Sequence, residues 1–370
     1  MTGHQEQLIL AVNPGATSTK LAVYSGENEQ WSEDVRHEAD RKWSSSFEQF
    51  EWRLNLIREK LTQKAVDLKS LSAVVGRGGP IAPMPSGTYL VDQELVNAIK
   101  DGKVIADHPS LLGPPLALAL ATEGGCKAYT VDPVSVDEFE DATRITGLPQ
   151  IERRSLSHAL NIKAMAREAS KRLEKPLEQL NLIVLHLGSG FTVAAQKQGR
   201  QVDSTDASAS GPIAPTRTGS LPALDFAKLC FSGQYTMKDI KKMLVGEGGW
   251  KAHLGTDDIR EIYKRIDDGD DRAALVLDAT LLSVAKETAA MAAVLDGTID
   301  AIVISGGVAR SQRFVDSLVA KLDWLGGTRI VVPGENEMKA LAGGALRVLD
   351  GEIQSTSMMS YVNKFQEVKS

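Results

Sequence analysis

The chain has 370 residues, of which 42% are hydrophobic and 24% are charged, a composition typical of soluble globular proteins. Its formal net charge of −6 gives no electrostatic reason to expect binding to nucleic acid. The two cysteines, Cys126 and Cys230, match no metal or disulfide pattern, the first residues lack an apolar signal region, and no apolar run is long enough to span a membrane. We therefore expect a cytoplasmic protein of two domains that binds neither nucleic acid nor membranes.

The segment LILAVNPGATSTKLAVY, residues 8–24, predicts two apolar strands joined by a polar turn. The turn contains a glycine, three hydroxyl side chains and Lys20. These groups suit a phosphate, because amides, hydroxyls and an ammonium group all donate hydrogen bonds to it. The turn is not a Walker loop, since GxxxxGK[ST] does not occur in the chain. The alternative is an ordinary hairpin with a polar turn.

A second candidate anion site follows a predicted helix over residues 47–64 and a short strand, Ser72–Val75. The strand leads into Gly76–Pro80, in which Arg77 lies among glycines. Glycines allow a ligand to approach the backbone closely, and a guanidinium group binds carboxylates and phosphates. A surface turn with a solvated arginine is the alternative.

Two titratable residues stand at the ends of predicted elements. His108 precedes an apolar helix over residues 111–122, where a cap or a packing role is the simpler interpretation. Asp132 ends a strand over residues 127–132. A carboxylate at the carboxyl end of a strand occupies the usual place for metal or catalytic chemistry in α/β sheets.

His158 lies in the first turn of a predicted helix that reaches about Leu173. Ser155 or Ser157 could cap this helix. His158 would then face whatever lies at the amino terminus of the helix.

The second half of the chain repeats the plan of the first. An apolar strand, Leu182–Leu187, runs through Gly188-Ser189-Gly190 into a returning strand over residues 192–195. Ala301–Ser305 then runs into Gly306-Gly307, as Ala73–Val75 ran into Gly76. The two halves are therefore predicted to be copies of one topology.

The remaining segments are predicted as follows. Residues 211–222 form a shaped loop with Arg217 at its centre, and residues 271–295 form a long Ala-rich helix buried in a core or a subunit interface. Thr256 could cap a helix that starts at Asp257, and the tail from Gln354 is expected to be loosely held. Further short elements are expected at residues 88–91, 225–232, 236–244, 330–332 and 338–349.

Taken together, these segments resemble the acetate and butyrate kinases of the superfamily of actin, hexokinase and the heat-shock ATPases, and the butyrate kinases most of all. The resemblance extends from Leu8 to about Gly351 and rests on blocks such as NPGATSTK, VVGRGGP, ERRSLSHALN, NLIVLHLGSG and PGENEMKALAGGALRVL. It implies an α/β fold of the two-domain actin-like ATPase (ribonuclease H-like) type, duplicated, with the active site in an interdomain cleft. The first domain is expected to hold residues 1–152 and 338–370, and the second domain residues 153–337.

The resemblance also implies roles for individual residues. The catalytic positions are matched by Arg77, Asp132, His158 and Arg217, the two arginines holding the acyl carboxylate and the transferred phosphoryl group. The nucleotide-binding positions are matched by Asn13, Gly15, Thr17, Ser18, Lys20, His186, Gly188, Ser189, Gly190, Gly306 and Gly307. Asp132 and Glu337 match carboxylates linked to metal, with Glu335 as the alternative to Glu337, and His108 matches a further active-site histidine.

The implied activity is reversible ATP-dependent phosphorylation of a short-chain fatty acid, butanoate giving butanoyl phosphate, with ATP/ADP and Mg²⁺ as cofactors. The expected partners are the small carboxylate, its acyl phosphate, and further copies of the chain in a homodimer or larger assembly. The alternatives are an acetate or propionate kinase, or a nucleotide-dependent sensor of the same fold that is not a kinase.

Four positions carry information about specificity and rate. The acetate kinases close their acyl pocket with bulky apolar groups at the positions of Gly79 and Ser157, so the small residues here predict a preference for longer acids. Ala16 stands in place of a hydroxyl residue, and Ser189 in place of a glycine. We expect these two changes, together with the unusual Val308–Arg310 segment, to alter rate or nucleotide preference without abolishing activity.

Overall fold

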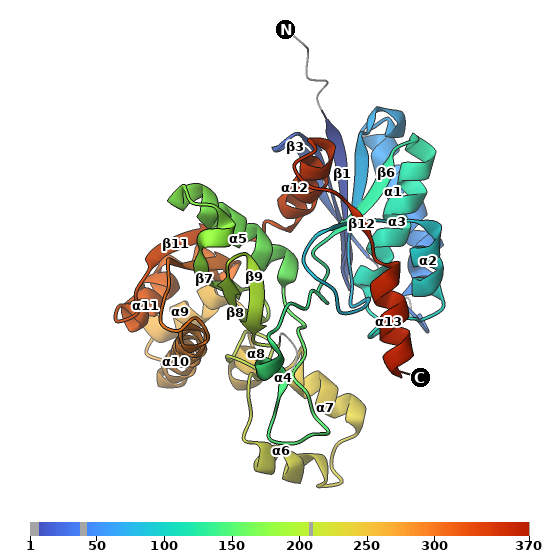
Figure 1. Ribbon diagram of the computed structural model, residues 1–370. Coiled ribbons are helices and arrows are strands. Elements are labelled where there is room, and N and C mark those ends of the chain that lie inside the picture. Colours follow the sequence, from blue (N-terminus) through green and yellow to red (C-terminus); the bar gives the residue numbers. More distant parts are fainter. Residues whose placement is uncertain (1–6, 38–42, 207–209, 370) are drawn as a thin grey trace. The chain divides into compact units, whose positions relative to one another are not determined.

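The computed structural model describes residues 7–37, 43–206 and 210–369, which form two compact units (Figure 1). The first unit comprises residues 1–137 and 336–370, and the second unit residues 138–335. The predicted boundaries, after residues 152 and 337, differ from these. Residues that follow 137 are held in the second unit, where the Glu138 carboxylate accepts hydrogen bonds from Lys163 Nζ and from the amide of Gln201. Residues 1–6, on which the expected lack of a signal region depends, lie outside the described part of the chain.

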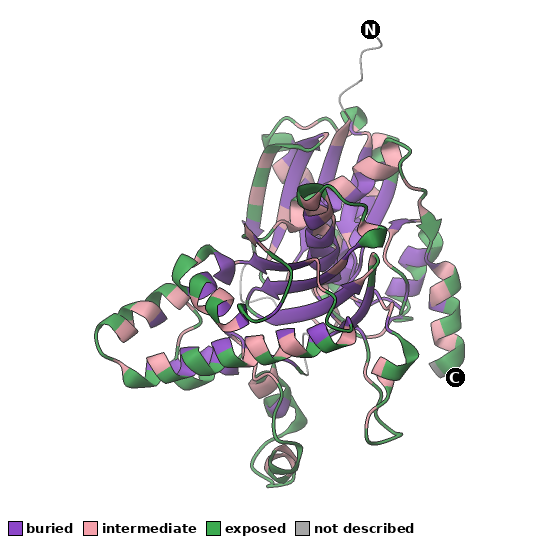
Figure 2. Cartoon of the chain, turned by 60° about the vertical axis from the view of Figure 1, so that its left-hand side comes forward, coloured by how far each residue is buried: buried purple, intermediate pink, exposed green. Residues whose placement is uncertain are grey.

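Within the described residues, seven strands form the sheet of the first unit, in the order β12-β5-β6-β4-β1-β2-β3. β1 pairs in parallel with β4 and antiparallel with β2, and its register places Asn13 opposite Lys20. The central strands are almost completely buried, as expected for apolar runs covered on both faces (Figure 2). The bounds of the seven strands are β1 Leu8–Pro14, β2 Ser18–Ser25, β3 Asn28–Arg36, β4 Ala73–Arg77, β5 Thr88–Leu90, β6 Lys127–Val131 and β12 Thr356–Ser357.

Helices α3 and α12 both pack against β1, β4 and β6 in the first unit. The expectation of a loosely held tail is wrong, because β12 pairs with β5 and the side chains of Met358 and Val362 are fully buried. The helices of this unit are α1 Phe50–Gln63, α2 Gln93–Lys100, α3 Gly113–Gly124, α12 Glu337–Leu349 and α13 Met359–Lys369, with the short 3₁₀ helices η1 Phe47–Gln49, η2 Leu68–Ser70 and η3 Pro109–Leu112.

The described part of the second unit contains a five-stranded sheet in the order β11-β10-β7-β8-β9. β7 pairs in parallel with β10 and antiparallel with β8, and β8 pairs antiparallel with β9. The first unit has the same relations among β1, β4, β2 and β3. The predicted duplication is therefore confirmed. The bounds are β7 Asn181–Leu187, β8 Phe191–Lys197, β9 Arg200–Ser204, β10 Ala301–Gly306 and β11 Thr328–Pro333.

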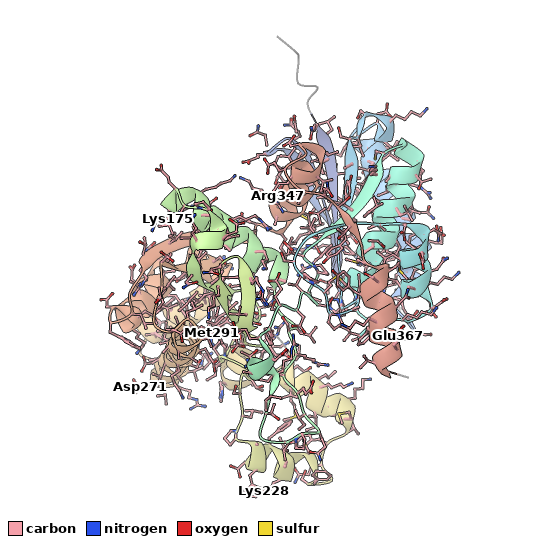
Figure 3. All side chains as sticks on the ribbon, in the orientation of Figure 1. Lys175, Lys228, Asp271, Met291, Arg347 and Glu367 are labelled. Atoms are coloured by element: carbon pink, nitrogen blue, oxygen red, sulfur yellow. The ribbon has the colours of Figure 1, made fainter. Side chains whose placement is uncertain are left out.

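Helix α5 packs on β7 and β10, and the long helix α10 packs on β7, β8 and β9. Figure 3 labels Asp271 at the start of α10 and Met291 on its buried side. No helix among the described residues is long and apolar enough to cross a membrane. The helices of this unit are α4 Asp141–Arg144, α5 Ala159–Leu173, α6 Ala223–Cys230, α7 Met237–Leu244, α8 Gly249–Leu254, α9 Ile259–Asp267, α10 Asp271–Val294 and α11 Gln312–Leu322, with η4 Leu177–Gln179 and η5 Val308–Arg310.

Two predicted helix caps are wrong. Helix α5 begins after His158, whose side chain makes no capping hydrogen bond, while Ser155 and Ser157 are buried before the helix starts. Helix α9 is capped by Asp258, whose side chain accepts from the amide of Arg260, and not by Thr256. In both segments the helix begins one or more residues further along the chain than the positions of the polar residues predict.

Candidate active site

The first predicted phosphate loop is the turn between β1 and β2. The amide of Gly15 donates to the carbonyl of Ser18 at 2.8 Å, which closes the turn. Thr17 is exposed at its tip, and Ser18 and Lys20 are partly exposed. Hydroxyl and amide donors therefore lie in or beside this turn, Lys20 follows in β2, and phosphate binding by this segment stays a prediction.

Asn13, Arg77 and Glu337 form one hydrogen-bonded group in the first unit. Arg77 Nη1 donates to Glu337 Oε1 at 2.7 Å, and Asn13 Nδ2 donates to Glu337 Oε2 at 2.7 Å. Glu337 is the first residue of α12, so a segment far along the chain supplies the carboxylate that orients both β-strand residues. Glu335 is exposed at the end of the second unit.

The glycines around Arg77 allow neighbouring segments to pack closely, and their role in the approach of a ligand stays a prediction. A Cβ at Gly76 would lie 2.1 Å from the carbonyl oxygen of Gly113, so β4 and the start of α3 meet backbone to backbone. A Cβ at Gly79 would lie 2.8 Å from the amide nitrogen of Leu111 and 2.9 Å from its side chain. Leu111 therefore fills the space into which a side chain at residue 79 would project.

Asp132 follows β6 and is 2% exposed. Its Oδ1 accepts hydrogen bonds from Ser86 Oγ at 2.7 Å and from the amide of Gly87 at 2.8 Å. Its φ of +39° is unusual for a residue other than glycine, and such backbone strain is often found at functional sites. A carboxylate oriented by two donors suits a hard cation such as Mg²⁺, which prefers oxygen ligands.

His108 caps a short helix. Its Nδ1 accepts from the amide of Ser110 at 3.2 Å and lies 2.8 Å from Ser110 Oγ, at the start of η3. The side chain is exposed. The capping role that the sequence left open is therefore present, and an active-site role for His108 stays a prediction.

The second predicted phosphate loop, Gly188–Gly190, connects β7 and β8. A Cβ at Gly190 would lie 2.1 Å from Cζ of Arg217, so the guanidinium group lies directly against the loop backbone. Thr216 also binds this loop, because its amide and its hydroxyl both donate to the carbonyl of Ser189. Burial lowers the pKa of Arg217 from its usual value, although Asp206 opposes this effect.

Two histidine rings are in contact in the second unit, with their planes inclined by 36°. The rings of His158 and His186 have centroids 4.5 Å apart, and His158 Nδ1 lies 2.8 Å from Thr192 Oγ1. His186 belongs to β7 and Thr192 to β8, so the hairpin that carries the second loop also orients His158. The structure thus brings together the second loop, Arg217, His158 and His186.

Ser157 belongs to a buried polar cluster. Its Oγ accepts from Gln201 Nε2 at 2.9 Å, and the same amide lies near Ser155 and Ser204. Ser157 is 2% exposed. Its small size therefore accommodates a hydrogen-bonded glutamine on β9, a contact that residue spacing alone could not predict.

Gly306 ends β10, and Gly307 follows it before η5. Gly306 has a φ of +97°, and a Cβ there would lie 2.4 Å from the carbonyl oxygen of Leu187. Gly306 and Gly334 exchange backbone hydrogen bonds, which ties the end of β10 to the end of β11. A Cβ at Gly307 would meet nothing within 4 Å, so this residue borders open space.

Arg53, which no sequence motif marks as a site residue, lies on α1 with only 1% of its surface exposed. Its guanidinium group contacts the first loop. The available signal is the apolar stripe of this helix, since Leu54, Ile57 and Leu61 are its other buried residues. An arginine on the buried face of a helix is expected to have hydrogen-bonding partners, because a charged side chain is almost never fully buried without them.

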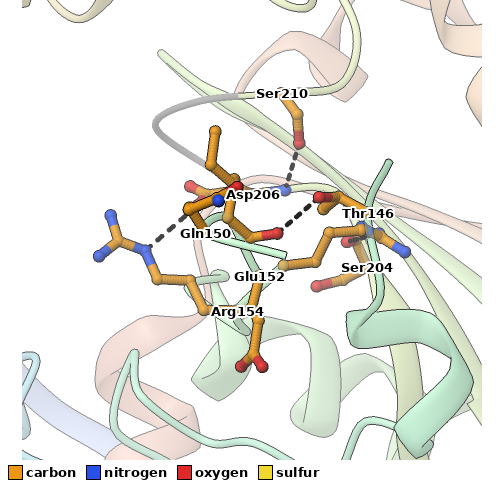
Figure 4. A pocket seen from close by; sticks show the side chains of 9 residues that line it. Thr146, Gln150, Glu152, Arg154, Ser204, Asp206 and Ser210 are labelled. Carbon is orange, nitrogen blue, oxygen red and sulfur yellow. Dashed lines mark hydrogen bonds and ion pairs between the residues drawn. The ribbon is translucent and has the colours of Figure 1, made fainter. Parts of the chain in front are cut away.

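A pocket of about 470 Å³ lies in the second unit (Figure 4). Arg154 faces Asp206 across it, with Nε and Oδ2 3.8 Å apart. The residues that line it are Thr146, Gln150, Ile151, Glu152, Arg153, Arg154, Ser204, Asp206 and Ser210.

Known proteins resemble this chain over almost its whole length. It is 44% identical to the probable butyrate kinase 2 of Caldanaerobacter subterraneus and 41% identical to the probable butyrate kinase of Listeria monocytogenes. Each match covers 93% of this chain and 97% of the relative.

Solved structures show the same fold at lower identity. Porphyromonas gingivalis acetate kinase superimposes with a TM-score of 0.77 at 17% identity, over 93% of this chain and 100% of that one. A propionate kinase from Francisella tularensis superimposes with a TM-score of 0.72 at 18% identity, over 91% and 98% of the two chains. The predicted actin-like ATPase fold class is therefore confirmed. The sequence profile of the acetokinase family matches residues 151–338. Together with relatives at 40–44% identity, this match shows that the chain belongs to the acetokinase family.

Proposed function

We propose that the protein transfers the γ-phosphoryl group of ATP to the carboxylate of a short-chain fatty acid, butanoate or a close analogue, in a reversible reaction. The observation that carries this proposal is the identity of 44% to a probable butyrate kinase over 93% of the chain. The arrangement within each unit supports it, because each contains a short Gly/Ser turn with an arginine beside it.

The acceptor needs no general base. A fatty-acid carboxylate is ionised at neutral pH, so it is already a nucleophile. The difficulty is that two anions must approach each other, and cations at the reacting groups reduce that barrier. We assign this work to Arg77, which Glu337 and Asn13 orient, and to Arg217, which lies against the second loop.

The carboxylates have different roles in this proposal. Asp132, oriented by Ser86 and Gly87, would hold Mg²⁺, which would neutralise charge on the phosphate oxygens when bound. Each Glu337 oxygen already accepts a hydrogen bond, from Arg77 or from Asn13. We therefore propose that Glu337 acts mainly by orienting those two side chains.

His158 is proposed to donate a hydrogen bond to the phosphoryl group as charge develops. Thr192 restricts the ring by a hydrogen bond and His186 by ring contact, so the ring enters the reaction already oriented. Nucleotide contacts are proposed for both loops and for Gly306 and Gly307, the latter bordering open space.

The preference for a longer acid stays a prediction. Because Leu111 fills the space beside Gly79 and Gln201 fills that beside Ser157, small residues at these two positions do not by themselves enlarge a pocket. An assay of acyl-hydroxamate formation with acetate, propionate, butyrate, isobutyrate and valerate at fixed Mg-ATP decides the point. We expect the highest kcat/KM with butyrate or isobutyrate, and a maximum with acetate would contradict the proposal.

The same assay, run beside ATP hydrolysis, separates a kinase from a nucleotide-dependent sensor. A kinase forms acyl phosphate in proportion to the ADP released when the acid is present. A sensor would hydrolyse ATP without forming hydroxamate from any acid in the panel, and that result would refute the proposed function.

We also propose a cytoplasmic homodimer or larger assembly. Helix α10 buries Val276, Met291 and other apolar residues within its unit, while Leu275 and Leu282 are 59% and 54% exposed. Covering these leucines with a second copy would remove apolar surface from water. Sedimentation at micromolar concentration tests this, and a monomer mass would refute it.

A further inference from the structure

The buried arginine of α1 holds the backbone of the first loop. Arg53 Nη2 donates to the carbonyl of Gly15 at 2.9 Å, and Nη1 donates to Thr19 Oγ1 at 3.1 Å and to the carbonyl of Ser18 at 3.5 Å. Its Nε and Nη2 also donate to Gln49 Oε1, at 3.0 and 2.6 Å. A guanidinium group has five N–H donors, so these five contacts use its whole donor capacity.

All five acceptor contacts are to uncharged groups. Two are backbone carbonyls, one is a hydroxyl, and two involve the side-chain amide of Gln49. Burial lowers the pKa of Arg53 to about 10, so it remains protonated at neutral pH. Neutral residues could also connect α1 to the turn by hydrogen bonds, and they would avoid the cost of burying a charge without an ionic partner. The use of a charged residue here therefore suggests a role beyond packing.

The contacts also set the direction of the loop's peptide groups. The carbonyls of Gly15 and Ser18 point to the guanidinium, and the Ser18 carbonyl also closes the turn by accepting from the amide of Gly15. Peptide groups whose carbonyls face a buried cation present their N–H ends elsewhere, as in anion-binding backbone turns. A positive charge in a weakly polarisable interior further favours an anion near the loop.

We propose that Arg53 is a positioning residue for the first phosphate loop. It acts through Gly15, Ser18 and Thr19, holding the turn in the form that accepts a nucleotide phosphate, without touching the ligand itself. Gln49 fixes the guanidinium in turn. This inference rests on the proposed function, since it takes the loop's ligand to be a phosphate group of ATP.

The test uses Arg53→Lys and Arg53→Ala in the full-length protein, with Arg58→Ala as the matched control. Arg58 lies on the same helix, but its guanidinium is exposed and pairs with Glu123. Arg53→Lys keeps the positive charge but loses the planar guanidinium group with its several N–H donors. Arg53→Ala leaves a space that a free guanidinium ion can enter. Thermal melts and circular dichroism establish the folded fraction of each variant.

We expect kcat/KM for ATP to fall about 10- to 100-fold in both Arg53 variants, because small displacements of a positioning group are costly to rate. The KM of the fatty acid should change less than the KM of ATP. Calorimetric titration with ATP should show weaker binding in Arg53→Lys than in Arg58→Ala. Millimolar guanidinium chloride, compared with sodium chloride, should restore part of the activity of Arg53→Ala alone.

Three results would overturn the inference: ATP binding by Arg53→Lys equal to that of Arg58→Ala, losses that merely follow the folded fraction, or equal changes in both substrate KM values without guanidinium rescue. Failure of the proposed function is distinguishable from these results. In that case the wild-type protein forms no acyl phosphate, whereas calorimetry with ATP still reports on Arg53.

Discussion

The two predicted phosphate loops occupy equivalent places in the duplicated sheets, yet their arginines contact them differently. The first loop lies between β1 and β2, and Arg53 reaches its carbonyls from α1. The second lies between β7 and β8, and Arg217 lies where a side chain at Gly190 would project. The shared topology thus places both turns, while segments outside the shared strands supply each cation. One cation supports the backbone and the other is proposed to meet the substrate.

The largest expected effect comes from the two arginines assigned to the substrates. Arg77→Ala and Arg217→Ala should each lower kcat/KM by about 10³-fold, roughly 4 kcal/mol of transition-state stabilisation, while the protein stays folded. Arg58→Ala and the exposed Arg260→Ala are controls for the two units. A wild-type kcat/KM in Arg217→Ala would refute the proposed substrate contact of Arg217. Lower stability of this variant with normal activity per folded molecule would show that Arg217 only anchors its loop.

The next effect compares one glycine from each of the two loops, Gly190 at the end of the second and Gly15 at the start of the first. A Cβ at Gly190 overlaps the flexible end of Arg217, whereas a Cβ at Gly15 would lie 3.3 Å from the carbonyl oxygen of Ser18. Gly190→Ala should therefore displace the guanidinium and lower kcat/KM by about 10²-fold with little change in Tm. Gly15→Ala should have a clearly smaller effect. Equal losses in both variants would mean that the two loops do not differ in the way described.

Asp132→Asn tests whether the first unit holds the metal. Asparagine tolerates the positive φ and can still accept from Ser86 and Gly87, so the fold should persist. The Mg²⁺ concentration for half-maximal rate should rise at least about 10-fold, because a carboxylate is replaced by a neutral amide. The surface variant Asp101→Asn is the control. An unchanged Mg²⁺ dependence would remove Asp132 from the metal site.

The smallest effect concerns the stability of the first loop's surroundings. His37 Nε2 lies 3.0 Å from Thr19 Oγ1, and burial together with the nearby Arg53 lowers the pKa of His37 to about 4, against the opposing charge of Asp34. The unfolded chain takes up this proton near pH 6.5 and the folded chain only near pH 4. Stability is therefore present above about pH 6.5 and lost as the pH falls to about 4.

His37→Gln should reduce this acid sensitivity by about 1–2 kcal/mol, a value lowered for the partial exposure of the ring. Melting temperatures between pH 4 and 7 measure it. The exposed His253→Gln of the second unit should follow the wild-type curve. Parallel curves for the wild type and His37→Gln would show that this histidine does not couple folding to pH.

Local patterns predict much of the framework. Apolar runs such as LILAV and LIVLHL predict strands, and the turns between them contain glycine and hydroxyl residues, so both loops are readable from neighbouring residues. The cap of α5 and the ordered tail cannot be predicted from neighbouring residues, because they depend on contacts with distant residues. Ser157 is held by Gln201, and Met358 is buried in the first unit.

The sequence also predicts which side chains are chemically suited to phosphate and carboxylate, since arginine, lysine and glycine-rich turns carry that property in themselves. Only the tertiary structure decides what each of them touches. It places Glu337 between Asn13 and Arg77, puts Leu111 in the space beside Gly79, and turns Arg53 toward the carbonyls of the first loop. These partners come from different elements, and a hydrogen bond depends on distances that one-dimensional spacing does not contain.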